Sequence, residues 1–562
     1  MAQKNQAMTD LLRYNVALAS GKRSRFNKSH SHTTTFDSGY IIPLMWDRVL
    51  PGDEKQIKYN GLARMATPLH PVMDQAIFDV WCFYVPDRLW YGHAKEFYGE
   101  NKDADFNPDG LYVMPYLKPS QYAVDNKKDR DIGIGSLNDY FGFPVGDRSQ
   151  TGFRYSDDDL NLRVSAGLHR SYQLIWNEWF RNSSIQPALQ LSDADVVTDE
   201  EWIVIQKLRK ANKYPDYFTS LLREPQAGPD VTIPLGNWAP VVTRSEMNYN
   251  SEKVPITSMR LVNSNGIEPV EAGSLAVNSQ GYIYSDSYFD LAENGPYTPA
   301  NLWANLSDAT SATINSLRTA FTVQQFLEIQ NRSGKRYQQI IYGFFGVLTG
   351  DSTLQRPQLL GSCSQDVGMR QVIQTSASND DSPLGNTAAF SITNINNEYI
   401  CNQSFTEGGF LLVLGCVRPV VSYSQGLDPL ITKLQPYEHY WPVFDNIGNQ
   451  PVYTRNLYLS HEFSDANDVF GYAEAWTEYR IKQNRVSGLM RPDVTGTLSS
   501  WNYSLYFDGT PYLDSKFIEV DPKLIDRTIS TPDEPQFICD SYFEYYDTKP
   551  MSVHSIPGLK TL

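Results

Sequence analysis

The apolar residues of this chain follow two different spacings, and the first of them predicts β-strands. Residues 77–85 are apolar apart from Asp79, which is typical of a strand that is buried on both faces. Pro86 ends this run, because proline has no N–H to donate to a neighbouring strand. Further strands are predicted at residues 56–65, 340–348, 405–421 and 452–459. The pattern therefore indicates a core that is rich in strands.

The second spacing is helical and occurs in a few short segments. In residues 166–181 one apolar stripe is formed by Leu168, Tyr172, Ile175 and Trp179. Ser165 precedes this stripe and is the predicted N-cap. Residues 313–331 keep the same spacing, and a shorter helix is predicted at residues 201–210. We therefore expect a few helices beside a larger number of strands.

The composition favours an all-β architecture with long loops. Aromatic residues make up 13% of the chain and suit pleated, half-buried surfaces, while 36 glycines and 33 prolines require many turns. The 562 residues are 41% hydrophobic, which is enough for several domains or for one domain with long insertions. No apolar stretch approaches the length of a membrane span, so no membrane insertion is expected.

Charge is distributed unevenly along the chain. The formal net charge of −16 argues against a protein whose outer surface wraps nucleic acid. Residues 1–36 nevertheless carry a balance of +5, because Asp10 is the only acid among six bases. The bases are Lys4, Arg13, Lys22, Arg23, Arg25 and Lys28. We therefore predict a basic N-terminal arm at residues 1–38.

Residues 229–312 differ from the sequence on either side. This segment holds nine acids and three bases, with many Asn, Gly and Ser residues and neither Cys nor His. It also contains apolar and aromatic residues that could form a small core of its own. The sequence therefore predicts a surface insertion that is exposed but not simply disordered.

The residue pattern gives no positive signal for an enzyme. The five cysteines are widely scattered, which indicates reduced thiols in a protein made in a cytoplasm, and Cys401 and Cys416 are interpreted as core thiols because they lie among strand residues. Among the histidines only His30 and His32 lie close together. The acidic run 157–159 is interpreted as a solvated loop rather than a glycosidase carboxylate site. We predict no catalytic, metal-binding or cofactor-binding residues.

Several short sequence blocks are weak individually but informative in their order. The first are Arg25-Phe26-Asn27-Lys28, Val49-Leu50-Pro51-Gly52-Asp53 and Phe83-Tyr84-Val85-Pro86-Asp87-Arg88. They are followed by Trp176-Asn177-Glu178-Trp179-Phe180-Arg181, Gly334-Lys335-Arg336-Tyr337, Leu354-Gln355-Arg356-Pro357 and Gly471-Tyr472-Ala473-Glu474-Ala475-Trp476. Across residues 23–225 and 312–510, this series resembles the major capsid proteins of the gokushoviruses, which are small icosahedral single-stranded DNA bacteriophages of the Microviridae.

The resemblance implies an all-β fold, namely an eight-stranded antiparallel jelly roll of the viral capsid type with long loop insertions and a few short helices. Sixty copies would close a T=1 icosahedral shell around single-stranded DNA. The protein would belong to the virion and would be assembled in the host bacterial cytoplasm. The jelly-roll core would comprise residues 39–228 and 313–562, and the second part would end in a C-terminal tail. The Tyr-rich run 542–546 in that tail is expected either near a subunit interface or in a solvated terminus.

The resemblance also implies partners for the basic arm and for the insertion. The arm is expected on the inner face, where DNA phosphates would be contacted by Arg13, Lys22, Arg23, Arg25 and Lys28. A small basic DNA-packaging protein is expected to supply most of the remaining positive charge. The insertion 229–312 is expected to form a three-fold protrusion that binds a host cell-surface receptor. Its candidate attachment residues are Tyr282, Tyr284, Tyr288, Phe289 and Trp303.

An alternative from a different class is a carbohydrate-binding or glycan-cleaving β-sandwich protein, which the abundant Trp and Tyr would suit. Such a protein needs aromatic faces exposed in a groove and, for cleavage, two opposed carboxylates. The tryptophans here are distributed over the whole chain, and no carboxylate pair is evident. Light scattering on the purified protein would separate a monomeric lectin from a shell or a five-fold subassembly.

Overall fold

The computed structural model describes residues 23–100, 112–118, 133–143, 163–232, 314–373, 387–459 and 464–554, together with short strands between 241 and 304. The chain divides into two compact units. The first comprises Met1–Ala227 and Glu328–Leu562, and the second is Gly228–Leu327. The first unit holds the predicted DNA-contacting residues, and the second holds the predicted attachment residues.

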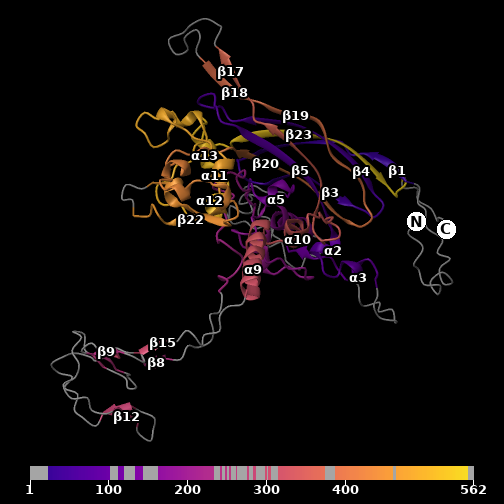
Figure 1. The fold of residues 1–562 in the computed structure, drawn as a ribbon. Helices are drawn as coiled ribbons and strands as arrows, with labels where there is room; N and C mark the ends of the chain where they lie inside the picture. Colours follow the sequence, from indigo (N-terminus) through magenta and orange to yellow (C-terminus); the bar gives the residue numbers. More distant parts are fainter. Residues whose placement is uncertain are drawn as a thin grey trace, which may run out of the picture. The chain divides into compact units, whose positions relative to one another are not determined.

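The first unit contains two antiparallel sheets that share a core (Figure 1). One sheet consists of β1 (Ser24–Asn27), β2 (His30–Phe36), β23 (Phe537–Lys549), β4 (Glu54–Met65) and β19 (Thr393–Ser404). The other consists of β16 (Gln358–Asp366), β5 (Ala76–Pro86), β20 (Gly409–Pro419) and β3 (Ile42–Val49). β1 and β2 both pair with β23, and the Lys28 N–H donates to the Tyr545 carbonyl between them at 2.8 Å. They therefore form one interrupted edge strand.

The order of these strands is that of a jelly roll. The first sheet runs β2-β23-β4-β19 and the second runs β3-β20-β5-β16, so the chain repeatedly crosses from one sheet to the other. A two-sheet antiparallel structure with this alternation is the double Greek key of viral capsid domains. The predicted all-β jelly roll with few short helices is therefore confirmed.

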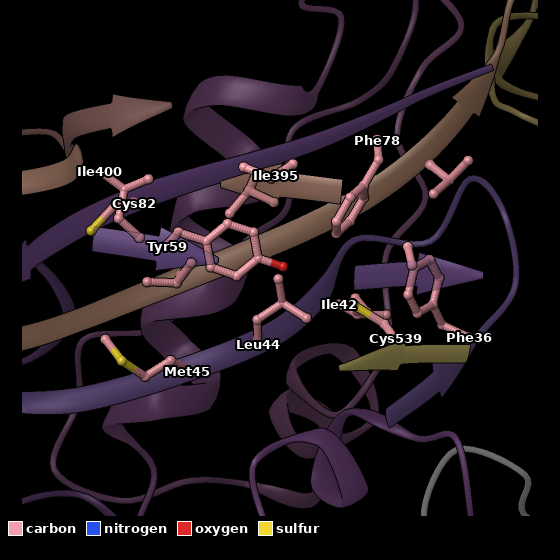
Figure 2. Close-up of a cluster of buried hydrophobic side chains, with 14 of the residues drawn as sticks. Phe36, Ile42, Leu44, Met45, Tyr59, Phe78, Cys82, Ile395, Ile400 and Cys539 are labelled. Atoms are coloured by element: carbon pink, nitrogen blue, oxygen red, sulfur yellow. The ribbon is translucent and has the colours of Figure 1, made fainter. Parts of the chain in front are cut away.

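The core between the sheets follows from strict alternation along the strands. β4 and β23 bury every second residue for most of their length, because successive side chains in a strand point to opposite faces. Figure 2 shows side chains from both sheets meeting in this core, among them Tyr59 from β4, Phe78 from β5 and Ile395 from β19. This shared apolar layer joins the two sheets into one sandwich.

β5 is buried on both faces, as its continuous apolar run predicts. Its Phe78, Val80, Cys82 and Tyr84 face the sandwich core, whereas Phe83 and Val85 belong to a second cluster on the outer side of the sheet. Helix α2 (Asp87–Trp90), helix α6 (Gly167–Ile175) and the π-helix η3 (Trp176–Phe180) contribute to that cluster. The predicted helix 166–181 is thus confirmed, with a π-helical end and with Ala166 rather than Ser165 at the N-cap.

Long insertions between the core strands carry the remaining elements of the first unit. Paired strands are β6 (Tyr116–Leu117) with β7 (Val164–Ser165), β17 (Met369–Ile373) with β18 (Thr387–Ser391), and β21 (Asn449–Tyr453) with β22 (Val469–Glu474). Short helices are α3 (Ala94–Phe97), α5 (Leu137–Tyr140), α7 (Asp199–Ile205), α10 (Tyr337–Phe345), α11 (Thr477–Arg480), α12 (Ser515–Ile518) and α13 (Lys523–Asp526). Single 3₁₀ turns are η4 (Pro429–Thr432), η5 (Pro436–Glu438), η6 (Pro442–Phe444), η7 (Thr454–Asn456), η8 (Gly488–Met490) and η9 (Ser499–Trp501).

The second unit contains short antiparallel strand pairs. They are β8 (Val241–Thr243) with β15 (Leu302–Ala304), β9 (Met247–Tyr249) with β10 (Glu252–Val254), β11 (Leu261–Val262) with β14 (Thr298–Pro299), and β12 (Leu275–Val277) with β13 (Ile283–Ser285). Helix α9 (Ile314–Ser333) begins in this unit and confirms the helix predicted at 313–331. No helix in the described ranges combines the length and apolarity that crossing a membrane requires.

Two of the strand predictions were wrong. Residues 340–348 lie in helix α10 and the turn after it, because a short apolar run suits a buried strand or a helix equally well. The glycine at position 346 favours the helix, because Gly346 adopts the left-handed backbone conformation at φ 66° that commonly ends a helix. Residues 452–459 form only the end of β21, followed by the 3₁₀ turn η7.

The Tyr-rich run 542–546 is neither a solvated tail nor an appended segment. It lies in β23, a central strand that pairs with β4 on one side and with β1 and β2 on the other. Phe543 and Tyr545 are buried in the sandwich core, whereas Tyr542 is 47% exposed on the other face. The alternation of the run reflects its position in a sheet with one buried face.

Candidate functional site

The described part of the basic segment belongs to the edge of the sandwich. Residues 24–27 form β1, whose register places Ser24 opposite Lys549 and Asn27 opposite Tyr546. Of the five predicted DNA-contacting residues, Arg25 lies on β1, Arg23 directly precedes this strand and Lys28 directly follows it. Arg13 and Lys22 lie outside the described residues.

Arg23 and Arg25 differ from Lys28 in how they are held. Arg23 and Arg25 are exposed and make polar contacts with neutral groups, namely the Gly52 carbonyl at 2.7 Å and the Gln56 side-chain oxygen at 3.1 Å. Arg23 also lies 3.9 Å from Glu54, and Arg25 stacks over the Tyr546 ring at 4.2 Å. Pairs at such exposed positions are weak, so both guanidinium groups can exchange these contacts for an anion.

Lys28 belongs to a charge cluster whose centre, Asp53, Lys55 and Asp547, is buried and whose other members are partly exposed. The charge cluster consists of Lys28, Asp47, Asp53, Lys55, Asp547 and Lys549. Lys55 has no exposed surface, and its Nζ lies 2.7 Å from an Asp47 carboxylate oxygen and 3.0 Å from an Asp547 oxygen. Lys28 Nζ contacts the same two carboxylates at 2.6 Å and 3.3 Å. Three lysines therefore balance three aspartates.

The charge cluster ties distant parts of the chain together. Lys28 follows β1, Asp47 and Lys55 come from β3 and β4, and Asp547 and Lys549 come from β23. Tyr545 donates to Asp47 and lies 2.5 Å from Lys55 Nζ, which links the cluster to the aromatic core. Buried charges persist only when they are paired and hydrogen-bonded, so this arrangement fixes how the first and last strands meet.

The pKa of Asp47 makes part of this stability dependent on pH. Burial would raise the pKa of this carboxyl, but attraction by Lys55 and hydrogen bonds from Lys28, Lys55 and Tyr545 outweigh it and lower the pKa to about 2. Since the folded pKa is below that of the unfolded chain, the contribution is present above about pH 4 and is lost as the pH falls to about 2.

We therefore expect acid to remove about 2 kcal/mol of unfolding free energy through Asp47 alone, since one pKa unit corresponds to about 1.4 kcal/mol. Chemical denaturation of the unassembled protein at intervals between pH 5 and pH 2 will measure the loss. The Asp47→Asn variant will start less stable and will lose less over this range. An identical pH dependence in both proteins would contradict the assignment.

The predicted attachment residues belong to the second unit. Tyr284 lies on β13 and Trp303 on β15, and these strands belong to different strand pairs, so their positions in the sheets do not bring the two residues together. Tyr282, Tyr288 and Phe289 lie outside the described residues. The host-attachment role of all five therefore stays a prediction.

Sequence reasoning missed an apolar surface in the insertion between β20 and β23. Residues 429–447, called here the aromatic loop, contain the turns η4, η5 and η6, each of which begins with a proline. Its large exposed side chains are Ile431, Leu434, Tyr437, Tyr440, Trp441, Val443 and Ile447. The regular spacing of Pro429, Pro436 and Pro442 among these residues is the signal that could have identified it.

The cysteines of the described residues serve the core. Cys82, Cys401, Cys416 and Cys539 are buried and Cys363 is partly buried, all as free thiols. The predictions for Cys401 and Cys416 are therefore confirmed. Burial also lowers the pKa of His169 to about 3, so this imidazole is a neutral core group. Across the described ranges, no three His, Cys, Asp or Glu side chains converge as a metal site would require.

Known proteins resemble this chain over nearly its whole length. The family described as "Capsid protein (F protein)" matches residues 15–559. Capsid protein VP1 of Chlamydia phage 1 is 33% identical, with 97% of each chain covered, and capsid protein VP1 of Spiroplasma virus 4 is 33% identical over 96% of each. Capsid protein VP1 of Bdellovibrio phage phiMH2K is 32% identical over 95% of each.

These similarities cover both the jelly-roll strands and the insertions between them, so they describe the whole chain rather than a shared module. They favour a structural protein over the carbohydrate-binding sandwich considered from composition. Together with the strand order of the two sheets, they show that this chain belongs to the phage capsid protein (F protein) family and is a major capsid protein.

Proposed function

We propose that this major capsid protein assembles into a T=1 icosahedral shell of sixty copies that encloses single-stranded DNA. Assembly would take place in the host bacterial cytoplasm, and the product would be the virion capsid. The observation that carries the proposal is the jelly-roll strand order in a chain that matches capsid proteins from end to end. Electron microscopy of particles purified after expression tests it, because a T=1 shell has a single size and icosahedral symmetry.

The same proposal places the basic segment on the DNA. Arg13, Lys22, Arg23, Arg25 and Lys28 would contact phosphates, which need no sequence-specific geometry. The accessibility of Arg23 and Arg25 supports a direct role, whereas Lys28 is already engaged by two carboxylates. Sixty arms of +5 supply about 300 charges, whereas about 1,700 nucleotides are needed to encode this chain alone. A small basic packaging protein or other cations would supply the rest.

We expect the double variant Arg23→Ser, Arg25→Ser to bind single-stranded DNA less tightly and with a weaker salt dependence. Each phosphate contact contributes about −0.7 to the log–log salt slope, so the slope should become shallower by about 1.4. Fluorescence anisotropy of a labelled oligonucleotide across a salt series will measure it.

Lys516→Ser, Lys523→Ser provides a control with the same loss of charge at exposed positions on α12 and α13. Its slope should match that of the unmodified protein. Equal slopes for the two double variants would reject phosphate contact by Arg23 and Arg25.

The insertion 229–312 would bind the host cell surface, and its copies would form a three-fold protrusion. Support comes from the separation of Gly228–Leu327 as a compact unit, since a segment that makes its own contacts can be gained or lost without rebuilding the sandwich. Tyr282, Tyr284, Tyr288, Phe289 and Trp303 are the candidates for receptor contact, because aromatic side chains dominate many binding surfaces.

Deletion of residues 240–305 with the ends rejoined should leave shells intact and abolish adsorption to host cells. Shell formation will be followed by electron microscopy, and adsorption by the depletion of particles from suspension. Replacing the five aromatic candidates by serine is the milder variant and should reduce adsorption without changing particle yield. Normal adsorption after the deletion would refute attachment, and failed assembly would assign the segment to the contacts of the shell.

A further inference from the structure

The aromatic loop exposes more apolar surface than a solvated loop requires. Val443 is 89% exposed and Leu434 is 84% exposed, and Tyr437, Trp441 and Ile431 each expose more than half of their surface. Single exposed apolar residues are common on proteins, but a concentration of them in one short segment marks an interaction site.

The loop is nevertheless held in one conformation. Its anchor is Trp476, which is buried, adopts the left-handed backbone conformation at φ 69°, and donates from Nε1 to the Phe444 carbonyl at 2.8 Å. The Tyr440 ring packs edge-on against the Trp476 ring at 5.7 Å. Trp441 Nε1 donates to the Pro436 carbonyl at 2.7 Å, within the loop itself. A partner would therefore meet an ordered surface and would not have to order it first.

The cations in and beside the loop are paired with acids, and the two carboxylates inside it, Glu438 and Asp445, accept hydrogen bonds within the chain, Asp445 from the Tyr440 hydroxyl at 3.4 Å. Lys433 bonds to Glu478, Arg480 lies 2.8 Å from Glu474, and Lys482 lies 2.9 Å from Asp428. The Glu438 carboxylate accepts the backbone N–H groups of Leu434 and Gln435 at 2.6 Å and 2.9 Å.

Burying a charge without partners is costly, so a surface whose cations are paired and whose carboxylates accept hydrogen bonds is suited to lose its water against an apolar partner. Phosphate binding, in contrast, needs cations whose charge is not already balanced by acids. The chemistry of the loop thus favours a protein surface over nucleic acid.

We propose that the aromatic loop is a contact between subunits and that its occupant is a second copy of this chain. This inference rests on the proposed shell. A closed shell brings each copy against others through heterologous contacts, in which one patch meets a different patch of the neighbour. The ordered, apolar loop of a capsid protein, with its charged groups already engaged within the chain, meets the requirements of such a contact, and burial of its side chains would contribute to shell stability.

The double variant Leu434→Asp, Val443→Asp tests the proposal. Neither side chain contributes to the described core clusters, so the subunit should fold with an unchanged melting temperature. The yield of shells should fall at least tenfold, because two carboxylates would be buried without partners. Met73→Asp, Tyr512→Asp is the matched control at residues that are each 74% exposed outside the loop, and it should assemble normally.

A second measurement does not depend on a variant folding. Hydroxyl-radical oxidation of Trp441 should be severalfold slower in assembled shells than in unassembled subunits of the unmodified protein. Equal oxidation in both states, or normal shell yield from the loop variant, would overturn the proposal. Normal shells that fail to infect would assign the loop to a partner other than a second copy. Failure of the unmodified chain to form shells would instead refute the proposed function.

Discussion

Replacing Lys55 by methionine will lower the unfolding free energy by about 3–5 kcal/mol, the usual cost of removing one partner from a buried ion pair. Methionine retains the length of the side chain but not its charge. Lys55 has no exposed surface and pairs with Asp47 and Asp547. Lys28 and Lys549 also contact Asp547, at 3.3 Å and 3.1 Å, but they are partly exposed and replace only part of the attraction that Lys55 provides. Denaturant titration of the unassembled protein will measure the change.

Lys58→Met is the matched control for this prediction. Lys58 lies on the same strand three residues later, where its side chain is partly exposed and its Nζ lies 3.6 Å from Glu544. Surface pairs of this kind contribute little, so the variant should unfold close to the unmodified protein. If Lys55→Met and Lys58→Met were equally stable, the charge cluster would not hold the first and last strands together.

Replacing Phe543 by alanine will cost about 3–5 kcal/mol of unfolding free energy, because it leaves a cavity in the middle of the sandwich. Phe543 is fully buried, packs 5.3 Å from the Tyr59 ring and stacks on His30 at 5.4 Å. Its loss therefore affects β23, β4 and β2 together. The same titration, with shell yield as a second readout, will measure it.

Tyr542→Ala separates core packing from a general effect of shortening an aromatic side chain. Tyr542 is the preceding residue on β23 and points to the opposite, half-exposed face. We expect little change in subunit stability. A destabilisation equal to that of Phe543→Ala would mean that β23 is not buried as the structure describes.

Local sequence patterns predicted the elements that carry strong signals of their own. The continuous apolar run of β5 predicted a strand that is buried on both faces, and the apolar stripe through Leu168, Tyr172 and Ile175 predicted helix α6. Strand β23 was not predicted: its run 542–546 was interpreted as part of a tail, and only the structure places it in a sheet. The apolar run at 340–348 was ambiguous, since its length suits either a strand or a helix such as α10.

For the candidate functional residues too, the sequence predicted which residues group together but not the contacts that each one makes. The clustering of Arg23, Arg25 and Lys28 is a property of the sequence, but their separation into two accessible guanidinium groups and one engaged ammonium group is not. Lys28 meets Asp547 only because β1 pairs with a strand more than five hundred residues later. No local pattern encodes a contact of that separation.

The sequence by itself therefore determined the class of the molecule: its periodicities predicted a strand-rich protein, and its ordered motifs identified a capsid family. Long-range packing determined where each residue acts. Because β1 and β2 pair with β23, part of the basic arm forms an edge strand of the sheet. The Tyr-rich run lies in β23, which is a central strand because it also pairs with β4. The anchoring of residues 429–447 on Trp476 left an ordered apolar surface exposed. Both outcomes depend on contacts between segments distant in the chain, which residue spacing alone does not specify.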